Sequence, residues 1–240
     1  SKDRYLQSNI LTMAARISLE LGNLIEVSKL ADQVKSISRM DDIDDSTRCV
    51  CLYNSAKLHV DWAAATARNG QKPERVAKEA IVDAEIALGV SEQHLEDTGV
   101  RSRLLQVLAH AKVFAGDSNY AISLLTCPLK GLAESWTWYT LWVLALAYVA
   151  EGRLAQAKVR LEFCTCACID VGLEHELEEA FELHSMVTMK EEEKDEDKNA
   201  SKDVLFQSRR SAGDERCAAN GTQRGGLGFN VVGRNPFYLA

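Results

Sequence analysis

The sequence predicts an all-α fold built from stacked helical hairpins, and three observations support this prediction. The clearest is a repeat of 36 residues, because Gly116 and Ala121 recur as Gly152 and Ala157. Apolar residues also recur at helical spacing almost continuously from Tyr5 to residue 189. Finally, the chain of 240 residues contains only three prolines and 7% aromatic residues, a composition that suits helices better than sheets.

The repeat extends beyond these glycines and alanines. Four further positions match between the two copies: Leu105, Leu108, Ala109 and Leu125 correspond to Leu141, Leu144, Ala145 and Leu161. A weaker third copy near the beginning of the chain comprises Leu11, Ala14, Ala15, Gly22 and Ala31. Units of this kind cannot bury their apolar faces alone, so they stack and leave an extended concave surface. We therefore expect a protein that binds other proteins.

The apolar pattern and its interruptions predict where each helix lies. We expect helices near residues 3–21, 23–39, 46–69, 73–89, 92–115, 117–127, 132–151, 153–171 and 173–190. Gly22, Gly116 and Gly152 are expected in short turns between antiparallel helices. Asp44 and Pro73 are suited to the first positions of the third and fourth helices. Ser91 is the candidate cap of the fifth.

The composition changes after residue 189. Residues 190–225 are charged or small, first acidic and then basic, with one apolar cluster at Val204, Leu205 and Phe206. Such a segment cannot bury enough apolar surface to offset its ordering entropy. We therefore expect a helical domain over 1–190, a disordered charged linker over 191–223 and a separate segment over 224–240. Because Ser1 is not methionine, we expect the chain to be a slice of a longer protein.

Charge and cysteine content restrict the class of protein. A net charge of −7 argues against a general nucleic-acid binder, which needs a basic surface. The most apolar stretch, residues 136–150, is shorter than the roughly 20 residues that span a membrane, and we expect no membrane span. Seven cysteines without the spacing of a disulfide framework fit a reducing compartment. We expect a cytoplasmic protein, with a nuclear location as the alternative.

These residues resemble the tetratricopeptide repeat superfamily over about residues 5–190. The match rests on Leu108, Ala109, Gly116 and Ala121 in one unit and on their counterparts, with Tyr148 as the family's aromatic residue, in the next. Both units depart from the family, since its repeats have about 34 residues and Lys112 replaces the first unit's aromatic residue. The resemblance implies a right-handed superhelix whose inner helices line a groove for a peptide.

Carried over position by position, the resemblance implies which side chains face this groove: Arg103, Gln106, Val107 and His110, followed by Tyr139, Trp142, Val143 and Leu146. The lysines and asparagines that grip a carboxylate tail in some members are missing. The implied partner is therefore an apolar or helical segment of a protein. Alternatively, Tyr139 and Trp142 pack against the next repeat or the last helix rather than against a ligand.

The C-terminal segment carries a second resemblance. Residues 224–233, and above all Arg224, Gly226, Leu227, Gly228 and Phe229, resemble the start of a PDZ domain. In that family this loop binds the C-terminal carboxylate of a peptide. Only seven residues follow Gly233, whereas a complete domain needs on the order of a hundred. We therefore expect a C-terminal peptide ligand only if the domain is completed in a longer chain; otherwise this glycine-rich tail resembles the family by chance.

The sequence contains no pattern typical of catalysis, a cofactor or a metal site. Cys164 and Cys168 share a helix face while Cys166 points away, so the three thiolates cannot converge on one ion. His175 and His184 are expected on an amphipathic capping helix without ligand spacing. We expect a non-catalytic interaction scaffold or adaptor. The alternatives are a structural subunit of a larger assembly and a regulatory domain of an enzyme outside this chain.

Overall fold

The computed structural model describes residues 2–94, 97–127, 129–133 and 136–193, and all regular structure within these residues is helical. This confirms the predicted all-α class. The helices are α1 (Lys2–Glu20), α2 (Leu24–Ser38), α3 (Asp45–Arg68), α4 (Glu74–His94), α5 (Thr98–Phe114), α6 (Ser118–Thr126), α7 (Thr137–Ala150) and α8 (Leu154–Val171). A further helix spans the described residues 174–193. The C-terminal residues 194–240, which include most of the predicted linker and the whole PDZ-like segment, lie outside the described residues.

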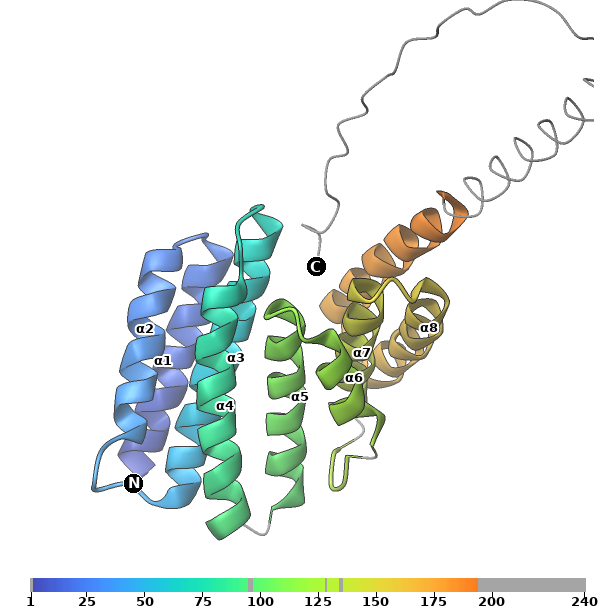
Figure 1. The fold of residues 1–240 in the computed structure, drawn as a ribbon. Coiled ribbons are helices and arrows are strands. Elements are labelled where there is room, and N and C mark those ends of the chain that lie inside the picture. Colours follow the sequence, from blue (N-terminus) through green and yellow to red (C-terminus); the bar gives the residue numbers. More distant parts are fainter. Residues whose placement is uncertain (1, 95–96, 128, 134–135, 194–240) are drawn as a thin grey trace, which may run out of the picture.

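Consecutive helices pair into hairpins that stack side by side in chain order (Figure 1). The pairs α1–α2, α3–α4, α5–α6 and α7–α8 are each in contact. The first helix of each hairpin also packs on the first helix of the hairpin before it, giving the contacts α1–α3, α3–α5 and α5–α7. Between the second helices of successive described hairpins, contacts are at most sparse. The first helices of successive hairpins are therefore packed more closely together than the second helices, and α2, α4 and α6 each also contact the first helix of the next hairpin.

The repeat glycines end their helices in the same way. Gly116 has a φ of 85° and Gly152 a φ of 70°, in the left-handed region that glycine occupies without steric cost. The Gly116 N–H donates to the Val113 carbonyl, and the next N–H donates to Lys112 one turn back. Gly152 and Gly22 make the equivalent pairs of bonds. This shared geometry confirms the predicted turns and aligns α1, α5 and α7 residue by residue.

Most predicted helix starts agree with the structure, but the predicted boundary between α4 and α5 was wrong. The Asp44 side chain accepts a hydrogen bond of 2.6 Å from the Thr47 N–H, which confirms the cap of α3. By contrast, α4 continues through Gly89 and Ser91 to His94. Ser91 is buried and caps nothing; Asp97 instead accepts from the Gly99 and Val100 N–H groups. Burial of neighbouring α4 side chains outweighs the low helix propensity of Gly89.

The last two helices also differ from their predicted bounds. α7 begins at Thr137 rather than near residue 132, and the final helix continues to at least residue 193 instead of ending at 190. The first three residues of the segment expected to be a linker, 191–193, are thus helical.

Small residues allow the hairpins to pack closely. Ala109, Ala121, Ala145 and Ala157 are fully buried, as the repeat predicts. They belong to one apolar core that extends from α3 to the final helix. A separate core cluster joins α1 and α2 to α3 through Ala15, Val34 and Leu58. None of the described helices is both long enough and apolar enough to cross a bilayer.

Candidate functional site

Six of the eight predicted groove residues are buried rather than exposed. Gln106, His110, Tyr139, Val143 and Leu146 each have 5% or less of their surface accessible. Val107 is fully buried as well. Arg103 and Trp142 keep part of their surface exposed. Most of the residues implied by the resemblance are therefore buried, and little of each is available to a partner. Gln106, His110 and Tyr139 lie at the seam between α5 and α7.

Side-chain hydrogen bonds join α5 to α7 and to the residue that precedes α7. The Gln106 amide donates to the Trp136 carbonyl at 3.0 Å and to the Thr140 hydroxyl at 2.7 Å. The His110 Nδ1 lies 2.9 Å from the Tyr139 hydroxyl. Burial, with a smaller contribution from the charge of Lys57, lowers the pKa of His110 to about 3. Tyr139 thus packs within the structure, but against His110 of the preceding helix α5 rather than against the next repeat or the last helix.

Arg103 is held at the edge of the same surface. Its guanidinium lies 5.9 Å from the centre of the Tyr53 ring on α3 and 5.8 Å from the centre of the Trp136 ring. These distances are typical of cation–π contacts. The side chain is therefore placed between two aromatic rings, where it joins α5 to its neighbours.

A groove of about 480 Å³ opens between α7, the end of α3 and the final helix. Its lining includes the two predicted residues Trp142 and Leu146 on α7. The opposite wall consists of the final helix, with Leu183, Met186 and Met189 as its apolar side chains. Figure 1 shows the final helix, in orange, beside α7 and α8. We call this site, with the acidic residues described next, the α7 groove.

The α7 groove has an acidic wall. Glu178, Glu179 and Glu182 line it, and the one lysine or arginine in its lining is Arg68. Arg68 lies 3.4 Å from the Glu179 carboxylate, and the His175 ring lies 3.9 Å from the same group. Glu178 and Glu182 are exposed, and neither makes an ion pair with another described residue. The groove thus combines an apolar floor with negative charge available to a ligand.

The final helix's share of this site was not predicted. Its sequence indicated a capping helix that carries His175 and His184, and the glutamates and methionines of that helix had no assigned role. Their spacing carried a usable signal, because His175, Glu178, Glu179, Glu182, Leu183, Met186 and Met189 recur every three or four residues. Which helix they would face could not be read from that spacing.

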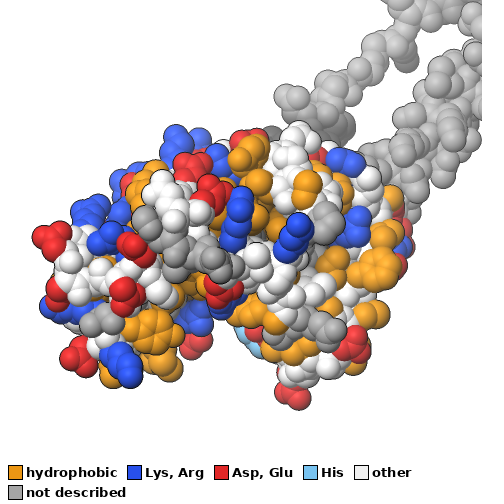
Figure 2. Space-filling model, turned by 90° about the horizontal axis from the view of Figure 1, so that it is seen from below, with side chains coloured by type: hydrophobic (Ala, Val, Ile, Leu, Met, Phe, Trp, Pro, Cys, Tyr) orange, Lys and Arg blue, Asp and Glu red, His pale blue; other side chains and the backbone are white. Residues whose placement is uncertain are grey.

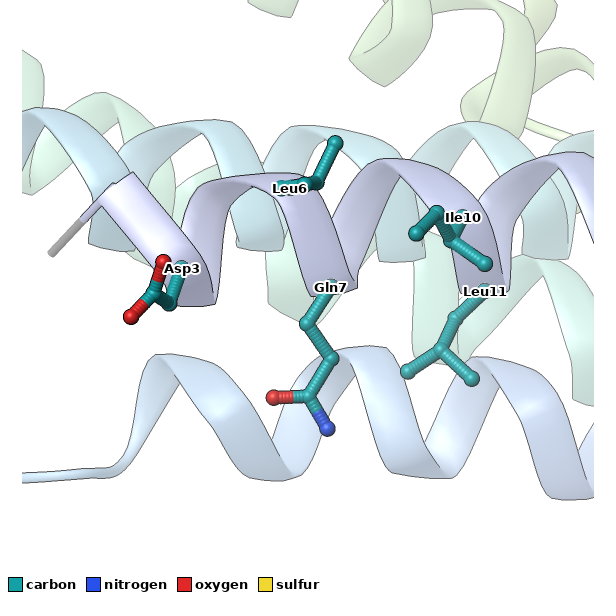
Figure 3. Close-up of a pocket in the computed structure, with 5 residues that line it drawn as sticks. All are labelled: Asp3, Leu6, Gln7, Ile10 and Leu11. Carbon is teal, nitrogen blue, oxygen red and sulfur yellow. The ribbon is translucent and has the colours of Figure 1, made fainter.

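A second surface lies at the other end of the molecule. A small hollow of about 240 Å³ is lined by Asp3, Leu6, Gln7, Ile10 and Leu11. Figure 3 shows Leu6 and Gln7 pointing to opposite sides of α1. Along the outer side of α1, Ile10, Met13 and Ile17 are 57%, 66% and 56% exposed. We call this row of side chains, together with Leu6, the α1 stripe.

The residues of the α1 stripe correspond to residues of α5 that are buried. When the Gly22 and Gly116 turns are aligned, Ile10, Met13 and Ile17 correspond to Leu104, Val107 and Ala111 of α5. Those three α5 residues are fully buried. Leu104, for example, packs with Leu52 of α3 and Ala87 of α4. The α1 stripe is thus the face that a preceding hairpin covers in the later repeat.

Serine, histidine, aspartate and lysine side chains, which are common in catalytic sites, meet between α2, α3 and α4. Their contacts stabilise the fold and do not form a catalytic arrangement. The Ser55 hydroxyl donates to the Asp83 carboxylate at 2.7 Å, and Lys35 lies 2.7 Å from its other oxygen. The His59 Nδ1 contacts the Ser55 carbonyl at 2.9 Å. Ser55, His59 and Asp83 are all buried, and the serine is bonded to the carboxylate rather than to the imidazole. This cluster ties three helices together and has no arrangement for nucleophilic catalysis.

The cysteines follow the predicted faces of their helix. Cys164 and Cys168 are buried and Cys166 is exposed. Burial raises the pKa of Cys164 well above that of an ordinary thiol. Among the described residues, no group of three histidine, cysteine, aspartate or glutamate side chains is placed to hold a metal ion.

The face of the molecule seen from below in Figure 2 mixes basic and acidic side chains without a continuous field of one sign.

No protein-family model matches the chain, and searches of curated proteins and of solved structures found no significant match.

Proposed function

We propose that this protein is a non-catalytic interaction scaffold or adaptor that binds a segment of a partner protein in the α7 groove. The observation that carries this proposal is the pairing of an apolar floor, formed by Trp142, Leu146 and Met186, with the acidic wall. A volume of about 480 Å³ falls within the range of about 300–1,000 Å³ that is typical of ligand sites.

The chemistry of the groove defines the partner. Two free carboxylates, Glu178 and Glu182, favour a segment with lysine or arginine next to its apolar anchors. An amphipathic helix presents such residues three and four positions apart, which matches the spacing of the wall. We therefore propose a helical partner segment with one apolar face and one basic edge.

The wider architecture supports the same class of function. The stacking of first helices in α1, α3, α5 and α7 is what a tetratricopeptide-like right-handed superhelix requires. We propose a cytoplasmic adaptor of this type. In a longer chain, a PDZ domain completed from Arg224, Gly226, Leu227, Gly228 and Phe229 would supply a second module for C-terminal peptides. Sequencing the transcript beyond Ala240 tests this extension, and a stop codon in every transcript would remove it.

The binding proposal is tested with the full chain and a charge-reversed groove. Replacing Glu178 and Glu182 with lysine changes exposed side chains, so the fold should persist. The matched control reverses two exposed acidic residues of α8 outside the groove, Glu162 and Asp170. Affinity-tagged chains capture partners from cell extract, and a peptide from each captured protein is then titrated by fluorescence anisotropy.

We expect proteins that bind the wild type and the control but not the groove variant. Peptides from those proteins should carry apolar and basic residues, and they should lose about tenfold in affinity against the groove variant. Equal capture by all three chains would exclude the α7 groove as the binding site.

A structural-subunit function is the second candidate, and the α1 stripe favours it. Since the equivalent face of α5 is buried by a helical hairpin, we propose that the α1 stripe would receive an apolar hairpin of another subunit. Replacing Ile10 and Met13 with glutamate should then release the chain from a large native assembly in size-exclusion chromatography. An unchanged elution position would reject this candidate.

A further inference from the structure

The charged C-terminal part of the chain contains one short apolar motif that is followed by two arginines. Val204, Leu205 and Phe206 are the apolar cluster of the charged segment, and Arg209 and Arg210 follow three and four residues after Phe206. The segment 204–210 lies outside the described residues. Its sequence combines apolar anchors with adjacent arginines, which is the chemistry that the α7 groove requires of a ligand.

The order of chemical groups in the segment also matches the order along the groove. On the final helix, Met189 and Met186 come nearest to the end of the described chain, and Glu182 and Glu178 lie further back. A chain that turns back after residue 193 therefore passes the methionines first and the glutamates second. In 204–210 the apolar residues likewise come first and the arginines second.

The lengths agree as well. Eleven residues separate Met189 from Glu178, or about 17 Å along a helix. Five residues separate Leu205 from Arg210, or about 17 Å in an extended chain. The eleven residues from 193 to 204 span up to about 36 Å, which is ample for a reversal beside the helix.

We propose that residues 204–210 of this same chain bind in the α7 groove, with Val204, Leu205 and Phe206 against Trp142 and the methionines and with the arginines against Glu178 and Glu182. This inference rests on the proposed function, because it names an internal competitor for the same site. A short connection gives such a segment a local concentration of the order of millimolar. Partners would then bind only by displacing it.

The test places a photoreactive group at the proposed anchor in the full chain. Phe206 is replaced by p-benzoyl-phenylalanine, whose benzophenone inserts readily into the C–H bonds of a nearby methionine. The matched control carries the same group in place of Phe237, another phenylalanine in the C-terminal part of the chain. Dilute samples are irradiated, and the crosslinked peptides are identified by mass spectrometry.

We expect crosslinks from position 206 to Met186 or Met189 within a single chain. Crosslinks from position 237 should show no preference for these two methionines. Arg209→Glu with Arg210→Glu should reduce the crosslinks about fivefold, and adding Glu178→Lys with Glu182→Lys should restore them. Crosslinks scattered over the surface, crosslinks between two chains, or a yield insensitive to charge reversal would overturn the proposal.

The same variants separate this proposal from the proposed function. A chain with Arg209→Glu and Arg210→Glu no longer holds its own segment tightly, so it should capture more of any partner that needs the groove. If it captures no such partner while the crosslinks from position 206 stand, the partner function fails and the internal contact remains. If the crosslinks fail while groove-dependent capture persists, only the internal competitor is rejected.

Discussion

Asp83 is the residue on which the contacts between α2, α3 and α4 converge. Its fully buried carboxylate accepts from Ser55 and lies 2.7 Å from the Lys35 ammonium. Burial acts to lower the pKa of Lys35, but hydrogen bonding and attraction to Asp83, with smaller contributions from Glu79, together outweigh it, so the pKa is raised. Lys35 also reaches Glu79, at 3.3 Å, near the surface. The two ion pairs of Lys35 therefore differ greatly in burial.

Replacing Asp83 with asparagine should be strongly destabilising. It leaves the lysine ammonium without its buried counter-charge, and we expect a loss of about 3 kcal/mol in the free energy of unfolding. The control Glu79→Gln removes the exposed partner of the same lysine and should cost less than about 1 kcal/mol. Urea unfolding followed by circular dichroism measures both. Equal losses would show that the burial of Asp83 does not matter.

The burial of His110 should make the stability of the folded chain depend on pH. Its pKa falls from 6.5 to about 3 in the folded chain because the ring is buried, and burial lowers the pKa of His59 as well. The unfolded chain therefore binds more protons than the folded chain between these values. The stabilisation that depends on these neutral histidines should therefore be complete above about pH 6.5 and decrease as the pH falls toward 3.

Replacing His110 with glutamine should flatten this dependence. The variant has one titrating site fewer. Between pH 6 and pH 4, the slope of its free energy of unfolding against pH should be smaller than that of the wild type by up to about 1.4 kcal/mol per pH unit. Glutamine can still hydrogen bond to the Tyr139 hydroxyl, so the variant should fold at pH 7. Urea titrations at several pH values measure both slopes. Equal slopes for the wild type and the variant would contradict a lowered pKa of His110 in the folded chain.

At the scale of a helix, glycine has opposite effects at a turn and inside a helix. Gly116 has a φ of 85°, whereas Gly89 lies within α4; an added methyl group would meet no atom within 4 Å at either position. Gly116→Ala should therefore cost about 1–2 kcal/mol through backbone strain alone. Gly89→Ala should stabilise by about 0.5–1 kcal/mol, because the unfolded chain loses freedom. Thermal unfolding measures the midpoint temperature of each variant relative to the wild type. Midpoints that shift in the same direction for both variants would contradict the prediction.

Helix positions were largely predictable because periodicity and turn chemistry act locally. The bounds of α2, α3, α6 and α8 lie within one residue of their predicted values. The errors occurred where tertiary packing outweighs local preference. α4 continues through Gly89 since its neighbours pack against α3 and α5, and the true cap at Asp97 lies six residues beyond the candidate Ser91.

At the scale of the whole molecule, the groove depends on contacts that no repeat unit contains. The resemblance to tetratricopeptide repeats implied that Gln106, Tyr139 and Val143 share one side of α5 and α7. It could not reveal that this side is covered, because the depth of a side chain depends on how closely α5 approaches α7. The α7 groove also needs Arg68 and Glu179, which meet across 111 positions of sequence.

The two ends of the molecule differ in burial, and local stability should follow this difference. In α1 the buried residues are Ser8, Thr12 and Ala15, whereas α7 buries seven residues, including Tyr139, Val143 and Leu146. In a stack of hairpins, each unit is stabilised mainly by its neighbours, and the α1 stripe has no described neighbour on its outer side. We therefore expect α1 to open more readily than α7.

Amide hydrogen exchange measured by mass spectrometry should show this gradient. The amides of α1 should exchange at least about tenfold faster than those of α7, which corresponds to a difference of about 1.4 kcal/mol in local stability. Val143→Ala, which removes buried apolar atoms between α5 and α7, should raise exchange in both of those helices. Met13→Ala, at an exposed position, should leave α7 unchanged. Equal protection of α1 and α7 would instead mean that the hairpins open as a single cooperative unit, and the exposed α1 stripe would then have no energetic consequence within the chain.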